Sequence, residues 1–233
     1  MDTNDSFAAI RFDQYTHMAE YGPCGYDIPN NFVANYVYSV PKVTSRLGFG
    51  NNRMAKAVLD DWQISGQTTF QSGTPFSPSF SVSGASGVNF TGTPSWGAIP
   101  LCVGNPTSGT TDSPYNRLNA SAFALPAVGS IGLGCSRDIL RGPGVNDFDM
   151  SLQKTVPFRE KARLVLRGEA FNVFNHTQFS GINHSLTYSS ITSTVPTNLP
   201  VNSSGALTNI NGFGTVSGVR SARVLQLVAK FVF

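Results

Sequence analysis

The side chains that could take part in catalysis or metal binding are few, and they form no known catalytic pattern. The three histidines, His17, His176 and His184, lie in predicted loops, without a cysteine or carboxylate at the spacing of metal ligands. Asp147 and Asp149 resemble a carboxylate pair, because residues two apart point to the same side of a strand. General acid–base catalysis also needs a partner group within reach, and none is in view. We therefore expect no enzymatic activity, no metal and no cofactor.

The three cysteines leave two interpretations open. In the first, Cys24, Cys102 and Cys135 are unpaired thiols without a special role. In the second, Cys102 and Cys135 form a disulfide inside one long loop, which an oxidising compartment would permit. Cys24 would then be left over or paired with upstream sequence.

The elements that would position these groups are β-strands. Five segments alternate polar and apolar residues with a period of two, which is the pattern of a strand with two different faces. These segments are 31–40, 59–72, 147–158, 161–174 and 222–233, with 8–16 as a weaker sixth candidate. They are longer than the roughly five or six residues usual in soluble sheets. The pattern predicts an all-β protein with about five or six antiparallel strands that cross a membrane.

Charged and aromatic residues occupy different places on these segments. Five charged residues at alternate positions would face the lumen of a barrel, where they form a charge network or contact the substrate: Asp147, Asp149, Arg163, Arg167 and Glu169. Lys154 is the one residue that breaks its strand's alternation. Several aromatic residues fall near strand ends, where girdles of transmembrane barrels lie: Tyr36, Tyr38, Trp62, Phe70, Phe148, Phe158, Phe231 and Phe233.

Short and long connections alternate between the five segments. Residues 41–58 and the pair Arg159-Glu160 make the shorter connections, whereas 73–146 and 175–221 are long and rich in Ser, Thr, Gly, Asn and Pro. Bacterial barrels have short periplasmic turns and long extracellular loops. We therefore expect 73–146 and 175–221 to be extracellular and the last strand to run from the outside to the periplasm.

The composition excludes several other classes of protein. Only 12% of the residues are charged and the net charge is +3, with no basic stretch typical of nucleic-acid binding. No apolar run of 18 or more residues predicts a transmembrane helix. The first residues lack the basic and apolar regions of a signal peptide, so we expect the true N-terminus to lie upstream and the chain to be a fragment.

The last segment has a pattern of its own. Apolar residues occupy every second position and the final residue is aromatic: Leu225, Leu227, Ala229, Phe231 and Phe233. This pattern resembles the β-signal that the barrel-assembly machinery reads. The alternative is an ordinary amphipathic edge strand that ends in phenylalanine.

A family resemblance follows from several motifs taken together. Residues 62–66 (WQISG), 71–76 (QSGTPF), 142–152 (GPGVNDFDMSL) and 163–176 (RLVLRGEAFNVFNH) resemble TonB-dependent outer-membrane receptors, above all the Oar-like type with a carboxypeptidase-regulatory-like domain. The resemblance implies a large transmembrane barrel of about 22 strands closed by a plug. It also implies transport energised by the TonB complex. Residues 1–233 would be the C-terminal segment of that barrel, without the plug and the N-terminal strands.

Two functions remain in competition at this point. The first is a receptor fragment in the outer membrane of a Gram-negative bacterium, whose long loops help to capture an unidentified ligand. The scarcity of charges in these loops suggests a neutral ligand such as a saccharide. The second is a non-transporting surface or adhesion barrel, or a structural protein. In both cases the membrane lipid and the barrel-assembly machinery are partners, and nucleic acid is not.

Overall fold

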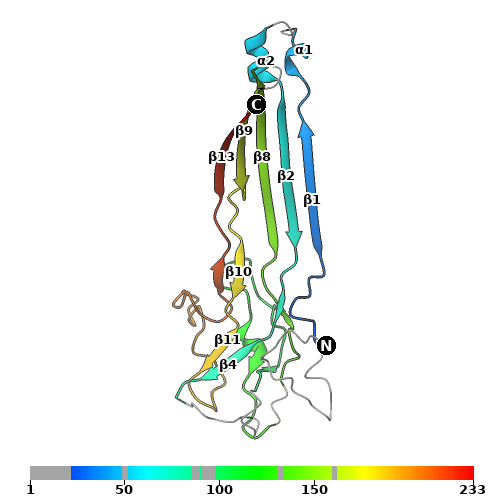
Figure 1. Cartoon of the computed structure of the whole chain (residues 1–233). Helices are drawn as coiled ribbons and strands as arrows, with labels where there is room; N and C mark the ends of the chain where they lie inside the picture. Colours follow the sequence, from blue (N-terminus) through cyan, green and yellow to red (C-terminus); the bar gives the residue numbers. More distant parts are fainter. Residues whose placement is uncertain (1–21, 49–51, 85–89, 91–97, 131–133, 159–161) are drawn as a thin grey trace. The chain divides into compact units, whose positions relative to one another are not determined.

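The computed structural model describes residues 22–48, 52–84, 90, 98–130, 134–158 and 162–233. The chain divides into two compact units. We call residues 30–71, 145–178 and 220–233 the sheet unit, and residues 1–29, 72–144 and 179–219 the loop unit. Figure 1 shows long strands in the sheet unit and short strands joined by irregular segments in the loop unit.

The sheet unit contains a five-stranded antiparallel sheet (Figure 1). Its strands, in spatial order, are β1 (Asn31–Ser39), β2 (Trp62–Gln71), β8 (Val145–Pro157), β9 (Arg163–Phe171) and β13 (Val224–Val232). Each strand corresponds to one of the five predicted segments, which confirms the predicted all-β class. The sheet does not close, so β1 and β13 are its two edges among the described residues. The weaker candidate 8–16 lies outside the described residues.

The strand register gives the sheet one apolar and one polar face, because residues directly opposite each other point to the same side. In β13, Leu227 pairs with Gly168 and Gln226 pairs with Glu169. The apolar face consists of Phe32, Ala34, Tyr36 and Tyr38, then Trp62, Ile64, Gly66, Thr68 and Phe70, then Phe148, Met150, Leu152, Lys154 and Val156, then Leu164, Leu166, Gly168 and Ala170, and finally Leu225, Leu227, Ala229 and Phe231.

The connection between β1 and β2 contains two short helices, α1 (Val43–Arg46) and α2 (Arg53–Leu59). The second begins because the Asn52 side chain accepts hydrogen bonds from the N–H groups of Met54 and Ala55, at 3.0 and 3.2 Å. The predicted strand from residue 59 is therefore wrong at its start, since Leu59 ends α2 and β2 begins at Trp62. Neither of these helices, nor any other helix in the described part of the chain, is long and apolar enough to cross a membrane.

The loop unit is held together by several short strand pairs rather than by one sheet. The pairs are β3 (Pro75–Phe76) with β7 (Leu140–Arg141), β4 (Ser79–Val82) with β11 (Ser185–Tyr188), β5 (Leu101–Cys102) with β6 (Phe123–Ala124), and β10 (Phe179–Ile182) with β12 (Val216–Val219). A 3-10 helix, η1 (Ala120–Ala122), precedes β6. The β4–β11 pair is parallel and joins the two long connections. The paired residues Ser81 and Thr187 are 106 residues apart in the sequence.

The two long connections share one hydrophobic core. Its buried residues are Leu118, Ala122, Phe123, Cys135, Leu140, Ile182, Leu186, Tyr188 and Phe213. Leu186 and Tyr188 are fully buried, and the Phe213 ring meets the Phe123 ring edge-to-face at a centroid distance of 5.6 Å. Both predicted loops therefore contribute to a packed structure, which their sequence had not revealed.

Candidate functional site

The apolar face of the sheet has aromatic rings at both ends. At one end the rings of Phe32, Phe70, Phe148 and Phe174 follow one another across the strands, with centroid distances of 6.2, 5.6 and 5.0 Å. At the other end Phe158, Phe231 and Phe233 form a second row, with successive distances of 6.2 Å. Two aromatic rows separated by aliphatic residues are the pattern of a surface that spans a bilayer and its two interfaces.

Lys154, which breaks the alternation of its strand, lies on the apolar face near the second row. Its side chain is buried, its Nζ donates a hydrogen bond to the carbonyl of Asp60, and it lies 5.5 Å from the centre of the Trp62 ring. The ammonium group thus reaches from the apolar face to a carbonyl at the end of α2. This is how a long basic side chain is accommodated at a membrane interface.

A buried carboxylate fixes the helical connection beside Lys154. Asp60 accepts hydrogen bonds from the hydroxyl and the backbone N–H of Thr44, at 2.5 and 3.0 Å. The hydroxyl bond, followed by the backbone bond, lowers the pKa of Asp60 below its ordinary value. Asp60 therefore joins α1 to the end of α2 as a charged anchor.

The polar face of the sheet carries the five charged residues singled out in the sequence. The register places all of them on this face: Asp147, Asp149, Arg163, Arg167 and Glu169. Arg167 donates a hydrogen bond to Glu169 within the same strand, so these two charges form an ion pair. Arg163 lies at the other end of β9, opposite Val232.

Asp147 and Asp149 hold the segment that follows β9. Asp147 accepts a hydrogen bond from the side-chain amide of Gln178 at 3.1 Å, and Asp149 accepts one from the backbone N–H of Asn172 at 2.9 Å. Asn172 in turn exchanges two hydrogen bonds of 3.0 Å with the backbone of His176. The two aspartates therefore anchor a turn. Among the described residues, no group of three or more His, Cys, Asp or Glu could hold a metal ion.

The terminal strand β13 presents both an open edge and an uncovered apolar side. It pairs only with β9 among the described strands. Leu225, Leu227, Phe231 and Phe233 are 68%, 89%, 56% and 94% exposed, and Ala229 is also exposed. An edge of this kind is a template for a further strand.

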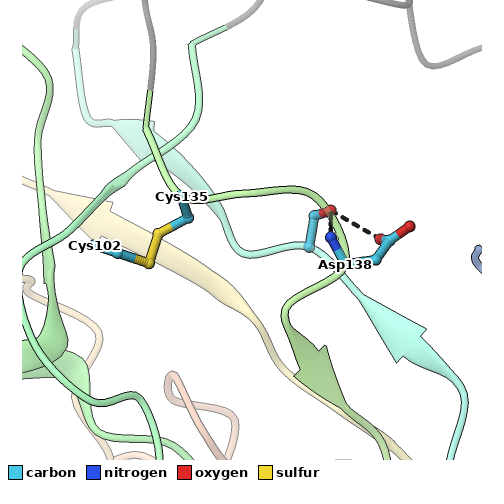
Figure 2. The surroundings of a disulfide bond; sticks show 4 residues. Cys102, Cys135 and Asp138 are labelled. Atoms are coloured by element: carbon cyan, nitrogen blue, oxygen red, sulfur yellow. Dashed lines mark hydrogen bonds between the residues drawn. A yellow bond between two sulfur atoms is a disulfide. The ribbon is translucent and has the colours of Figure 1, made fainter. Parts of the chain in front are cut away.

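In the loop unit, Cys102 and Cys135 form a disulfide, one of the two alternatives left open by the sequence (Figure 2). It joins the end of β5 to the segment before β7, and 33 residues separate the two cysteines. Next to it, Asp138 exchanges two hydrogen bonds of 2.9 Å with the Ser77 hydroxyl, which ties this segment to the residues after β3 (Figure 2). Cys24 is free.

A polar cavity of about 380 Å³ lies within the loop unit. Thr110, Thr111, Asp112, Arg117, Arg141 and Ile182 are among the residues that line it. The guanidinium of Arg117 donates to the carboxylate of Asp112 at 3.0 Å and to its carbonyl at 2.8 Å. Arg141 is ion-paired with Asp27 at 2.5 Å. Each arginine of the cavity thus has its charge balanced by an aspartate.

His184 lies beside the same core, with its ring 5.1 Å from the Phe76 ring. Burial lowers the pKa of this imidazole below its ordinary value of 6.5, and a hydrogen bond with the backbone of Ser77 opposes the effect. Among the described residues, its Nδ1 is buried without a hydrogen-bond partner. No pattern in the sequence pointed to this environment of His184. His176 is exposed, and His17 lies outside the described residues.

The comparisons with known proteins agree with this geometry. The family model of the outer membrane beta barrel domain matches residues 1–226. Neither the curated proteins nor the solved structures gave a match. A sheet with one apolar face and two aromatic rows is what such a domain contributes to a barrel wall. The chain therefore belongs to the outer membrane beta barrel domain family, whose members are located in the outer membrane of Gram-negative bacteria.

Proposed function

We propose that the chain is the C-terminal part of a TonB-dependent receptor barrel and that its loop unit helps to capture the ligand. The observation that carries the proposal is the compact loop unit, with its shared core, its disulfide and its polar cavity. Loops that only bridge strands have no need of such a core. Binding residues are commonly held on loops that a rigid scaffold positions. The receptor type rests on the resemblance of residues 62–76 and 142–176.

The direction of the strands follows from where the connections lie. The β1–β2 and β8–β9 connections lie at one end of the sheet, and the β2–β8 and β9–β13 connections lie at the other. Short turns of bacterial barrels are periplasmic and long loops extracellular. In the proposed orientation the loop unit is therefore formed by extracellular segments. The disulfide between Cys102 and Cys135 suits that oxidising side of the cell.

The polar cavity favours a neutral, hydroxyl-rich ligand such as a saccharide. Its arginines are already paired with Asp112 and Asp27, so the cavity offers no excess positive charge for an anion. Thr110 and Thr111 add hydroxyl groups that both donate and accept. The volume is within the range of small-molecule sites.

The polar face of the sheet would line the barrel lumen. Charges buried in a lumen are stabilised by partners of opposite sign or by hydrogen bonds. The Arg167–Glu169 pair and the hydrogen bonds of Asp147 and Asp149 satisfy these charges within the chain. We therefore assign these residues, together with Arg163, to the lining of the lumen rather than to direct contact with the substrate.

The terminal strand β13 would be the β-signal. Its apolar residues Leu225, Leu227, Ala229, Phe231 and Phe233 occupy every second position. Its free edge and exposed apolar side are accessible to an assembly factor that binds by adding a strand. After assembly the same edge would close the barrel against a strand other than those of the described residues.

Uptake by whole cells tests the transport proposal. A strain that lacks the gene is complemented with the complete gene, and cells receive a panel of radiolabelled neutral malto-, cello- and xylo-oligosaccharides. We expect one member of the panel to bind and enter only when the gene is present. A protonophore removes the gradient that energises TonB, so it should abolish entry and leave surface binding.

A pair of arginine variants links uptake to the cavity. Arg117→Ala should weaken binding of the same oligosaccharide, whereas Arg220→Ala, at an exposed position outside the loop unit, should not. Entry that survives the protonophore would rule out TonB-energised transport. Attachment of cells to a surface that depends on the gene, without uptake of any panel member, would favour the adhesion function.

A further inference from the structure

The helix α2 exposes apolar residues on one side. Met54 and Val58 are four residues apart, so they lie on the same side of the helix, and they are 82% and 63% exposed. Lys56 lies on the opposite side and Arg53 flanks the apolar side, and both are exposed. A helix with apolar residues on one side and basic residues on the other is suited to the interface between a bilayer and water.

The apolar side of α2 is continuous with the membrane-facing side of the sheet. Ala57 and Val58 line an apolar hollow of about 620 Å³ together with Trp62, Leu152, Leu166 and Leu227. The last four residues belong to the apolar face defined above. The Trp62 indole also donates a hydrogen bond of 2.8 Å to the carbonyl of Val58, which fixes the helix against this face.

The helical connection is also strongly basic. Residues 41–58 contain Lys42, Arg46, Arg53 and Lys56, and they contain neither aspartate nor glutamate. Asp60 and Asp61 follow directly after α2, and Asp60 interacts with both Thr44 and Lys42, so the carboxylates offset part of the four positive charges. The remaining positive charge complements anionic phosphate groups, because each basic residue adds attraction to an anionic membrane surface.

We propose that the α1–α2 connection is an interfacial anchor whose apolar side lies among the phospholipids of the inner leaflet of the outer membrane. The apolar hollow receives acyl chains, and the basic residues bind phosphate headgroups. Lys154 supports this placement of α2 at the membrane interface. Its buried side chain extends to the end of α2, where its ammonium group leaves the apolar region. The choice of the inner leaflet rests on the strand direction given under the proposed function.

Site-specific photo-crosslinking in cells tests this anchor. The photoreactive amino acid p-benzoylphenylalanine replaces Met54 in one variant and Gln226, an exposed residue on the polar face of the sheet, in a matched control. Cells that express the complete gene are irradiated, and the adducts on the labelled peptide are identified by mass spectrometry. We expect phospholipid adducts at Met54 several times more often than at Gln226. A third variant at Val58 should behave like Met54.

The possible adducts separate the competing explanations. A protein adduct at Met54, or equal lipid yields at Met54 and Gln226, would overturn the anchor. A lipopolysaccharide adduct at Met54 would place α2 in the outer leaflet, which would contradict the strand direction while leaving the family assignment intact. Each variant is first tested for assembly: its heated and unheated samples must migrate differently on gels, as those of the parent protein do. Variants that fail this test are left out, so that failed assembly cannot imitate a negative result.

Discussion

Two leucines of this chain occupy opposite environments. Leu227 in β13 of the sheet unit is 89% exposed, whereas Leu186 in β11 of the loop unit is fully buried. Apolar surface is unfavourable in water, so each unit must remove it by a different route. The loop unit uses a core of its own, and the sheet unit, as part of an outer-membrane barrel, uses the hydrocarbon of the bilayer.

The difference also concerns how each unit satisfies its backbone. In the sheet, nine- to thirteen-residue strands pair along their length, as hydrocarbon surroundings require. In the loop unit, strands of two to four residues alternate with turns. Side chains accept hydrogen bonds from backbone N–H groups of both, as Asn198 does from Thr187 in β11 and Asn202 from Ala206 in a turn. One environment therefore demands regular structure, and the other tolerates irregular structure with many polar side chains.

The largest expected effect comes from opening the core of the loop unit. Phe213→Ala removes a buried ring from its edge-to-face contact with Phe123 and should cost about 3–5 kcal/mol. Trypsin should then cleave the loop unit at Arg117 and Arg141, while the sheet retains its heat-dependent migration on gels. Loss of that migration together with the cleavage would show that the two units do not fold independently.

A charge in the middle of β13 tests whether the apolar face of the sheet unit contacts the hydrocarbon of the bilayer. Leu227→Arg places a cation on the apolar face and should cost about 2–4 kcal/mol at the bilayer midplane. We expect little assembled protein in outer-membrane fractions. Gln226→Arg is the control, because Gln226 faces the opposite side and pairs with Glu169. Equal losses for both variants would refute the assignment of the two faces.

The sequence predicted the sheet unit well because the bilayer imposes one rule on every strand. The alternation in 222–233 placed Leu227 and Gln226 on opposite faces, and the register bears this out. Lys154 broke the alternation because its partner is a carbonyl 94 residues away, at Asp60. The predicted start of β2 was wrong because Asn52 caps a helix that continues to Leu59, and the alternation that begins at Trp62 does not mark where this helix ends.

The loop unit could not be predicted in the same way. Leu186 and Phe213 meet the residues of 73–146 only through tertiary contacts, and no periodic pattern precedes them. Even the roles of Asp147 and Asp149 depend on distant partners, at Gln178 and Asn172, 31 and 23 residues further along the chain. The number of cysteines did not decide whether a disulfide forms, because spacing alone does not reveal which thiols approach each other.

Removing the disulfide should have a smaller effect than opening the core, and one confined to the loop unit. Replacement of Cys102 and Cys135 by serine removes a cross-link between positions 33 apart in the sequence and should destabilise the loop unit by about 2–4 kcal/mol. Faster cleavage by trypsin measures the loss. Cys24→Ser should have no effect, because Cys24 is free. A double variant with the parent's rate of cleavage would contradict this prediction.

The smallest expected effect is a pH dependence of the loop unit between about pH 8 and 5. Burial holds the pKa of His184 below 6.5, so the unfolded state binds a proton more readily than the folded state. The stability due to neutral His184 is therefore complete above pH 6.5 and is lost as the pH falls through the lowered pKa.

Trypsin cleavage of the loop unit, measured from about pH 8 to 5, should accelerate on the acid side. His184→Gln should remove this acceleration, whereas His176→Gln, at an exposed position of the sheet unit, should retain it. An acceleration unchanged by His184→Gln would mean that another group of the loop unit controls it.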